Sequence, residues 1–240
     1  MTQTTVKPQR SGYDPLAEMD EEQSRAQRSK FSSFFLTLKA GEKAWIRPLL
    51  NLDACVVLNM HDKFDETLNK STVSAVCAQE VELDCQHCVD AAQDKKLTAR
   101  KHFFLPIYVH GVWKMNDKKE WVAVYTKDES GEQVSYRGVR LLDLKGDIQH
   151  QLKSEYQESD DRTITNKDFV ILRTGGGRSD THYTVTQKAK AGGLPADVPA
   201  QNRETVRESI IRMREPKSVD STSQPYADVP PPDDEGDEFP

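Results

Sequence analysis

Hydrophobic and polar residues alternate in short runs through the middle of the chain. From Phe31 onward the sequence contains apolar and β-branched segments at 42–50 (EKAWIRPLL), 54–61 (ACVVLNMH), 102–113 (HFFLPIYVHGVW), 120–127 (EWVAVYTK), 167–175 (KDFVILRTG) and 181–187 (THYTVTQ). Turn-forming residues such as AG, ND, ESG and GGG separate these segments. Short runs of this kind are typical of an antiparallel barrel or sandwich. We therefore predict a mainly β core over residues 31–187.

Two segments follow the period of a helix instead. In DLKGDIQHQLKSEYQES, Leu144, Ile148 and Leu152 lie four residues apart, which predicts a helix that packs one face on the β core. A Gly/Pro/Ala linker then leads to NRETVRESIIRMREP, where Asn202 is a candidate N-cap. Residues 188–217 are therefore expected to be a linker and a short helix. The RTGGGRSDTHYT segment lacks a phosphate-loop motif and is expected to be the tip of a hairpin.

The two ends of the chain differ from the core in composition. Residues 1–30 are rich in Gln, Ser, Glu and Arg and are expected to form a disordered arm. The net charge is −6, but seven of the 39 acidic residues and no basic residue lie in 218–240, so residues 1–217 carry 33 basic and 32 acidic residues. We expect 218–240 to be a disordered acidic tail. The nearly neutral body still allows a local basic groove for a polyanion.

No apolar run approaches the roughly 18 to 20 residues that a membrane span needs, and the N-terminal segment has no apolar stretch typical of a signal peptide. We expect a cytoplasmic protein without a membrane partner. In a reducing cytoplasm, clustered cysteines are more often metal ligands or reactive thiols than a disulfide framework.

Three of the four cysteines lie within CAQEVELDCQHC at 77–88. Cys85 and Cys88 have the C-x-x-C spacing that lets two thiolates bind one ion, and Cys77 precedes them by eight positions. His61, at the end of a predicted strand, is the candidate fourth ligand, and His87 is the alternative. This pattern favours a zinc site over a group of buried or redox-active thiols.

Three thiolates and one imidazole would leave no open coordination position for water, which a catalytic zinc requires. The H-x-E and P-C-x-x-C signature of zinc deaminases is also absent, because His61 is followed by Asp62 and Lys63. The zinc is therefore expected to be structural, and we expect a protein that is not an enzyme. A zinc-dependent nuclease is a weaker alternative.

Basic and aromatic residues are interleaved in LTARKHFFLPIYVHGVWK, where Arg100 and Lys101 lead into Phe103 and Phe104. Tyr136 and Arg137 form a similar pair in SYRGVR. Single-stranded nucleic acid is bound in grooves where cations contact phosphates and bases stack on aromatic rings. Because Phe103 and Phe104 are adjacent, a regular strand directs them to opposite faces, and at least one is expected to be accessible. Further candidate phosphate contacts are Arg47, Arg173 and Arg178.

In their order along the chain, these features resemble the zinc-containing single-stranded DNA-binding (helix-destabilising) proteins of tailed bacteriophages. The resemblance covers about residues 33–187. It rests on KAGEKAWIRPLL, on VVLNMH followed by C-x7-C-x2-C, and on the later segments RKHFFLPIYV, YRGVRLLDLKGDI and KDFVILRTGGG.

The resemblance implies an OB-fold-like antiparallel barrel with a zinc-binding subdomain inserted at about residues 60–100. It also implies a set of zinc ligands, namely His61, Cys77, Cys85 and Cys88. The residues expected to line the DNA cleft are Arg100, Lys101, Phe103, Phe104, Tyr136 and Arg137.

The acidic tail is expected to compete with DNA for the basic groove and to recruit replication or recombination proteins. Its candidate partner-binding residues are Asp233, Asp234, Glu235, Asp237, Glu238 and Phe239. The hypothesis from the sequence is a sequence-independent single-stranded DNA-binding protein for phage DNA replication, recombination or repair, located in the host cell cytoplasm. The alternative is a zinc-stabilised adaptor that recruits replication proteins and binds nucleic acid only incidentally.

Overall fold

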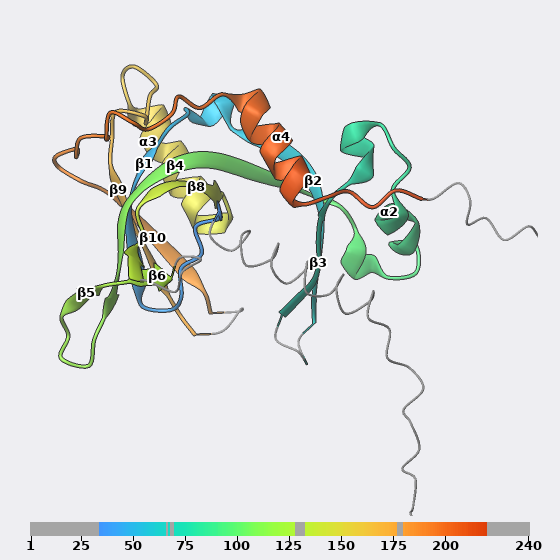
Figure 1. Ribbon diagram of the computed structural model, residues 1–240, viewed down its shortest axis with the longest axis horizontal. Helices are drawn as coiled ribbons and strands as arrows, with labels where there is room; N and C mark the ends of the chain where they lie inside the picture. The colour runs from blue at the N-terminus through green and yellow to red at the C-terminus, as the bar shows by residue number, and fades with distance from the viewer. Residues whose placement is uncertain (1–33, 66, 68–69, 128–132, 177–179, 220–240) are drawn as a thin grey trace, which may run out of the picture. The chain divides into compact units, whose positions relative to one another are not determined.

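A computed structural model of the protein describes residues 34–65, 67, 70–127, 133–176 and 180–219 (Figure 1). Within these residues the chain divides into two compact units. The first comprises residues 34–57 and 102–213, and the second comprises 58–101 and 214–219. The expected N-terminal arm and the acidic tail from residue 220 lie outside the described residues.

Most of the regular structure is β. The strands are β1 Glu42–Pro48, β2 Val56–Asp65, β3 Lys70–Val76, β4 Arg100–Met115, β5 Trp121–Ala123, β6 Tyr125–Lys127, β7 Gln133–Ser135, β8 Gly138–Asp143, β9 Phe169–Thr174 and β10 His182–Gln187. Among the described residues, eight of them belong to one antiparallel sheet, and β6 pairs with β7 in a separate two-stranded sheet. In the first unit the order is β10-β9-β1-β4, with β5 and β8 also paired to β4. The predicted mainly β, antiparallel fold is confirmed and is consistent with an OB-like description, although no pairing among the described strands closes a barrel.

The core of the first unit follows the two-residue period of its strands. Ala44 and Ile46 of β1 are fully buried, and so is Ile171 of β9, which pairs with Ala44. Residues between them point to the other face of the sheet. The pairing of β1 with β4 shifts by one residue between Trp45 and Ile46, where β4 carries His110 as the extra residue of a β-bulge. The bulge lets two large rings, Trp45 and His110, share one side of the sheet.

Three α-helices and three 3-10 helices accompany the described strands. They are α2 Gln86–Asp90, α3 Gly146–Glu158, α4 Arg203–Met213, η1 Leu52–Ala54, η2 Ala78–Val81 and η3 Lys95–Leu97. None of the described helices is long and apolar enough to cross a membrane.

Helix α3 confirms the helix predicted from the four-residue apolar spacing. It buries Ile148 and Leu152, and Gln151 fixes it to β10: the Gln151 amide donates to Tyr183 O at 3.0 Å and accepts from Val185 N at 2.6 Å. The short helix predicted after Asn202 is also confirmed as α4. The Asn202 side chain accepts a hydrogen bond from Thr205 N at 2.9 Å, as an N-cap does.

The glycine-rich segment joins β9 to β10 as an antiparallel pair, as predicted for a hairpin. Gly175 directly follows β9 with φ of 80°, a conformation that favours glycine.

The second unit is built on the antiparallel β2 and β3 pair, in which His61 lies opposite Ala75. Residues 214–219 run along this unit and donate or accept backbone hydrogen bonds. Val76 N donates to Arg214 O at 2.9 Å, and Gln86 N donates to Lys217 O at 3.0 Å. The insert expected at about residues 60–100 lies within this unit, which also includes a returning segment that the sequence pattern did not predict.

Candidate metal centre and nucleic-acid interface

Four side chains of the second unit converge as one cluster. His61 comes from β2, Cys77 follows the end of β3, Cys85 directly precedes α2, and Cys88 lies in the first turn of α2. Their ligand atoms all lie within 4.8 Å of one another, and His61 is fully buried. The four residues predicted as ligands are thus brought together and could hold a metal ion.

The distances within the cluster fit a tetrahedral ion. His61 Nε2 lies 3.3 Å from Cys85 Sγ and 3.6 Å from Cys88 Sγ, and Cys77 Sγ lies 3.6 Å from Cys88 Sγ. Metal–sulfur bonds of about 2.3 Å at tetrahedral angles place two sulfurs about 3.8 Å apart. The cysteines are free thiols, and a sulfur separation of 3.6 Å is far longer than a disulfide bond.

The other ring nitrogen of His61 fixes the orientation of its imidazole. His61 Nδ1 lies 2.5 Å from Leu97 O. A carbonyl oxygen only accepts, so Nδ1 carries the proton and Nε2 directs its lone pair at the cysteines. Metal-binding histidines generally donate a hydrogen bond in this way from the ring nitrogen that does not bind the metal. His87, the alternative ligand, is not a member of the cluster; its ring centroid lies 5.4 Å from that of His61.

The thiols differ in how readily they ionise. Burial and the neighbouring Cys77 and Cys85 raise the pKa of Cys88 to about 12. Burial also opposes ionisation of Cys85, but backbone N–H groups of Ala78 and Cys88 and the adjacent thiols outweigh it and lower the pKa of Cys85. Cys85 is therefore the thiol that ionises most readily, and a bound cation would favour ionisation of the other two.

The segment after the cluster is strongly basic. Arg100 and Lys101, predicted to contact DNA, are exposed at the start of β4. Lys95 and Lys96 in η3 are exposed as well, and neither is among the DNA-contacting residues predicted from the sequence. Their signal in the sequence was the DKKL run just before Arg100. Within seven residues the second unit therefore presents four exposed cations.

Phe103 and Phe104 are directed to different environments, as their adjacency predicts. Phe104 is 3% exposed and packs edge-on against Phe35 at 6.0 Å, so it offers no surface to a nucleic acid. Phe103 is half-buried and lines a recess of about 560 Å³.

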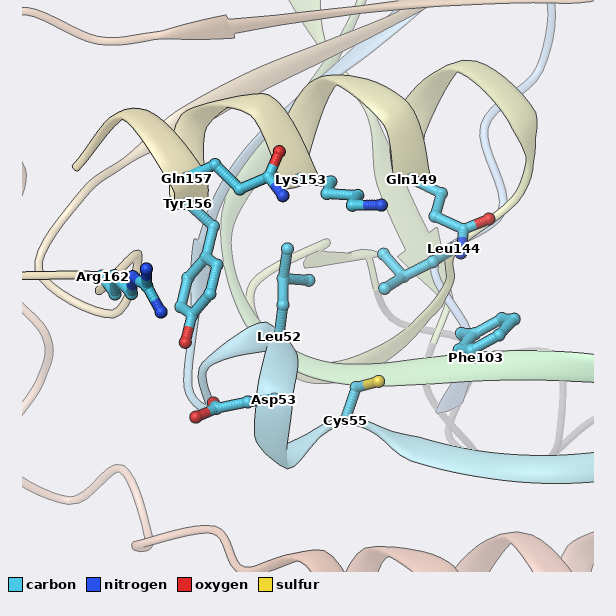
Figure 2. A pocket seen from close by; sticks show the side chains of 10 residues that line it. All are labelled: Leu52, Asp53, Cys55, Phe103, Leu144, Gln149, Lys153, Tyr156, Gln157 and Arg162. Carbon is cyan, nitrogen blue, oxygen red and sulfur yellow. The ribbon is translucent and has the colours of Figure 1, made fainter.

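The recess lies between α3, η1 and the strands beside it (Figure 2). Phe103, Cys55 and Leu144 lie at one end of it, and Tyr156 and Arg162 lie at the other. Lys153 projects into it from α3. Two aromatic rings, two cations and the carboxylate of Asp53 therefore line one open recess of the first unit.

Tyr136 and Arg137 lie between β7 and β8. Arg137 is exposed and Tyr136 is half-buried. The guanidinium of Arg140 lies 5.6 Å from the centre of the Tyr136 ring, which is cation–π contact. Arg137 is therefore accessible to a nucleic acid, whereas the Tyr136 ring packs partly against the core of the first unit.

Arg47 is held inside the first unit. Its Nε donates to Asp168 Oδ1 at 2.6 Å, and Asp168 is fully buried. A second guanidinium nitrogen donates to Gly192 O at 2.5 Å. With its charge paired in this way and only 9% of the residue exposed, Arg47 positions the loop at Gly192 and offers no surface to a phosphate.

Arg173 also has internal partners, since it donates to Leu38 O at 2.6 Å and to Thr181 Oγ1 at 3.2 Å. It is half-buried on β9. Arg178 and the tail residues Asp233, Asp234, Glu235, Asp237, Glu238 and Phe239 lie outside the described residues.

Comparisons of the chain with known protein families, with curated proteins and with solved structures find no match.

Proposed function

We propose that this protein binds single-stranded DNA without sequence preference, that it is not an enzyme, and that a structural zinc ion holds its second unit together. Three cysteines and one histidine at tetrahedral spacing are a donor set that suits zinc. All four coordination positions are used by the protein, which favours stabilisation over catalysis.

One contact carries the proposal. His61 Nδ1 donates to the carbonyl oxygen of Leu97, and Arg100 and Lys101 follow three and four residues later. The metal ligand therefore fixes the backbone that leads into the exposed cations. A zinc site placed here stabilises a basic surface and needs no reaction of its own.

The aromatic residues support single-stranded nucleic acid as the ligand. Phe103 lines an open recess with Lys153 and Arg162, and Tyr136 lies beside Arg137. Stacking of a base on an aromatic ring contributes about 1 to 3 kcal/mol and tolerates any base. Cations beside such rings contact the phosphates, so the combination favours single-stranded over duplex nucleic acid.

We further propose that the protein acts in phage DNA replication, recombination or repair, as the resemblance to the zinc-containing helix-destabilising proteins implies. The acidic residues at the end of the chain would then compete for the basic surface and recruit partner proteins.

The test is a titration of zinc-replete protein with a fluorescent dT oligomer at several salt concentrations. We expect binding whose log–log dependence on salt falls by about 0.7 for each phosphate contacted. Arg100→Gln/Lys101→Gln should weaken binding and flatten this dependence. Lys118→Gln/Lys119→Gln removes the same charge from an exposed turn and should leave the dependence on salt unchanged. Equal effects of the two double variants would contradict a specific role for the basic segment.

A further inference from the structure

The outer face of the first unit's sheet carries all three tryptophans of the chain. Strand alternation directs Ala44 and Ile46 into the core, and Trp45 of β1 therefore points to the opposite face. Trp113 of β4 and Trp121 of β5 line the same recess as Trp45, which measures about 300 Å³. A solvated sheet face normally carries polar residues, so three indoles gathered there indicate a binding surface.

Two lysines complete the recess. Lys43 Nζ lies 3.7 Å from the centre of the Trp121 ring, and Lys188 Nζ lies 3.4 Å from that of Trp45. Each ammonium thus contacts an indole face. Val170 supplies the remaining wall.

The recess is built on rigid supports. Trp45 stacks on His110 with 4.4 Å between ring centroids, and its Nε1 donates to Asp168 at 2.7 Å. Trp113 lies close over Gly111, where a Cβ would come within 2.7 Å of the indole. Trp121 is the outermost ring, with 36% of the residue exposed. The inner indoles are therefore held in place, and the outer one is accessible.

The positive charge of the recess has no counter-ion among the described residues. The ion pairs of the described part of the chain involve other side chains than Lys43 and Lys188. Burial lowers the pKa of Lys43, and the neighbouring charge of Lys188 lowers it further. Two like charges beside indole rings favour a ligand that is both anionic and aromatic.

We infer that this tryptophan–lysine recess is a second binding site for single-stranded nucleic acid, in which a base stacks on Trp121 and the adjoining phosphates contact Lys43 and Lys188. The inference rests on the proposed function for the class of its ligand, but it involves other residues than the basic segment at 95–101. Its volume, near the small end of the range for ligand pockets, suits one base rather than a folded partner.

Intrinsic fluorescence tests the inference directly, because every tryptophan of the chain lies in this recess. Titration of the full-length, zinc-replete protein with a dT oligomer should quench tryptophan emission. An abasic oligomer of equal length, which keeps the phosphates but has no bases, should quench much less. Trp121→Leu should weaken dT binding by about 10-fold, and Trp121→Phe, which keeps a stacking surface, should restore most of it.

The charge of the recess is tested with Lys43→Gln/Lys188→Gln. The log–log salt dependence of oligomer binding should flatten by about 1.4, which corresponds to two phosphate contacts. The matched control is Lys39→Gln/Lys190→Gln, which removes two exposed charges that do not line the recess. Thermal unfolding of all variants separates lost contacts from lost folding.

The outcomes distinguish this inference from the proposed function. If the wild type binds the dT oligomer but shows no quenching, and Lys43→Gln/Lys188→Gln binds like its control, the recess is not a nucleic-acid site and the proposed function stands. If the wild type does not bind the oligomer at all, both fail. Quenching by a peptide of residues 218–240, with none by the oligomer, would also overturn the inference.

Discussion

Replacing Asp168 with asparagine removes one charge from the interior of the first unit and leaves Arg47 without its counter-ion. Asp168 Oδ1 accepts from Arg47 Nε, while Oδ2 accepts from Trp45 Nε1 at 2.7 Å and from Gly192 N at 2.6 Å. An asparagine whose oxygen keeps the Trp45 and Gly192 contacts must turn its NH2 group toward the Arg47 N–H. The substitution therefore places two donors face to face and leaves a buried cation unpaired.

Breaking one side of a buried ion pair typically costs about 3–5 kcal/mol. For a protein of this length, each kcal/mol lowers the melting temperature by about 2–4 °C, so Asp168→Asn should lower it by roughly 6–20 °C. Asp117→Asn, in an exposed turn, is the control and should change the free energy of unfolding by less than about 0.5 kcal/mol.

The assay is urea denaturation at neutral pH followed by tryptophan fluorescence, which reports on Trp45 within the same network. A second substitution sharpens it. In Arg47→Met/Asp168→Asn the unpaired cation is gone, so the double variant should be more stable than Asp168→Asn alone. The reasoning is refuted if Asp168→Asn unfolds within about 1 kcal/mol of the wild type, or if the second substitution destabilises it further.

Three other predictions follow from the same structure. Burial opposes ionisation of Asp168, but the hydrogen bonds from Gly192, Trp45 and Arg47 outweigh burial and lower the pKa of this carboxyl. The ionised Asp168 should therefore stabilise the fold above about pH 3.9, and this contribution should be lost as the pH falls through the folded pKa. Acid denaturation of the wild type compared with Asp168→Asn measures the loss. Cys85→Ser should lose bound zinc and hydrogen-exchange protection in the second unit, whereas Cys55→Ala should keep its zinc; equal zinc content would contradict the site. Gly175→Ala should destabilise by more than about 1 kcal/mol in urea denaturation, because its Cβ would meet Asp180 O at 1.9 Å, while Gly176→Ala meets nothing within 4 Å; equal midpoints would contradict this.

Local patterns in the sequence predicted many of the elements of the fold. The four-residue spacing of Ile148 and Leu152 predicted α3, and Asn202 predicted the start of α4, because both signals depend on neighbours within a few residues. The candidate metal ligands could also be predicted from the sequence, because the spacing of His61 and the three cysteines limits how their side chains can converge.

Contacts between distant segments could not be predicted in this way. The Arg47–Asp168 pair joins positions 121 apart, and nothing near Arg47 marks it as buried. The adjacency of Phe103 and Phe104 predicted opposite faces but not which of the two faces the interior. The three tryptophans lie on separate segments, and only the sheet register places them around one recess.

The central claim is tested most directly by one titration of a dT oligomer with zinc-replete protein at two salt concentrations. We predict binding at low salt that weakens steeply at high salt, and a loss of affinity when a chelator removes the zinc, because the metal site fixes the backbone before Arg100 and Lys101. The absence of binding at low salt by protein that retains its zinc, tested also after deletion of residues 218–240, would contradict the account.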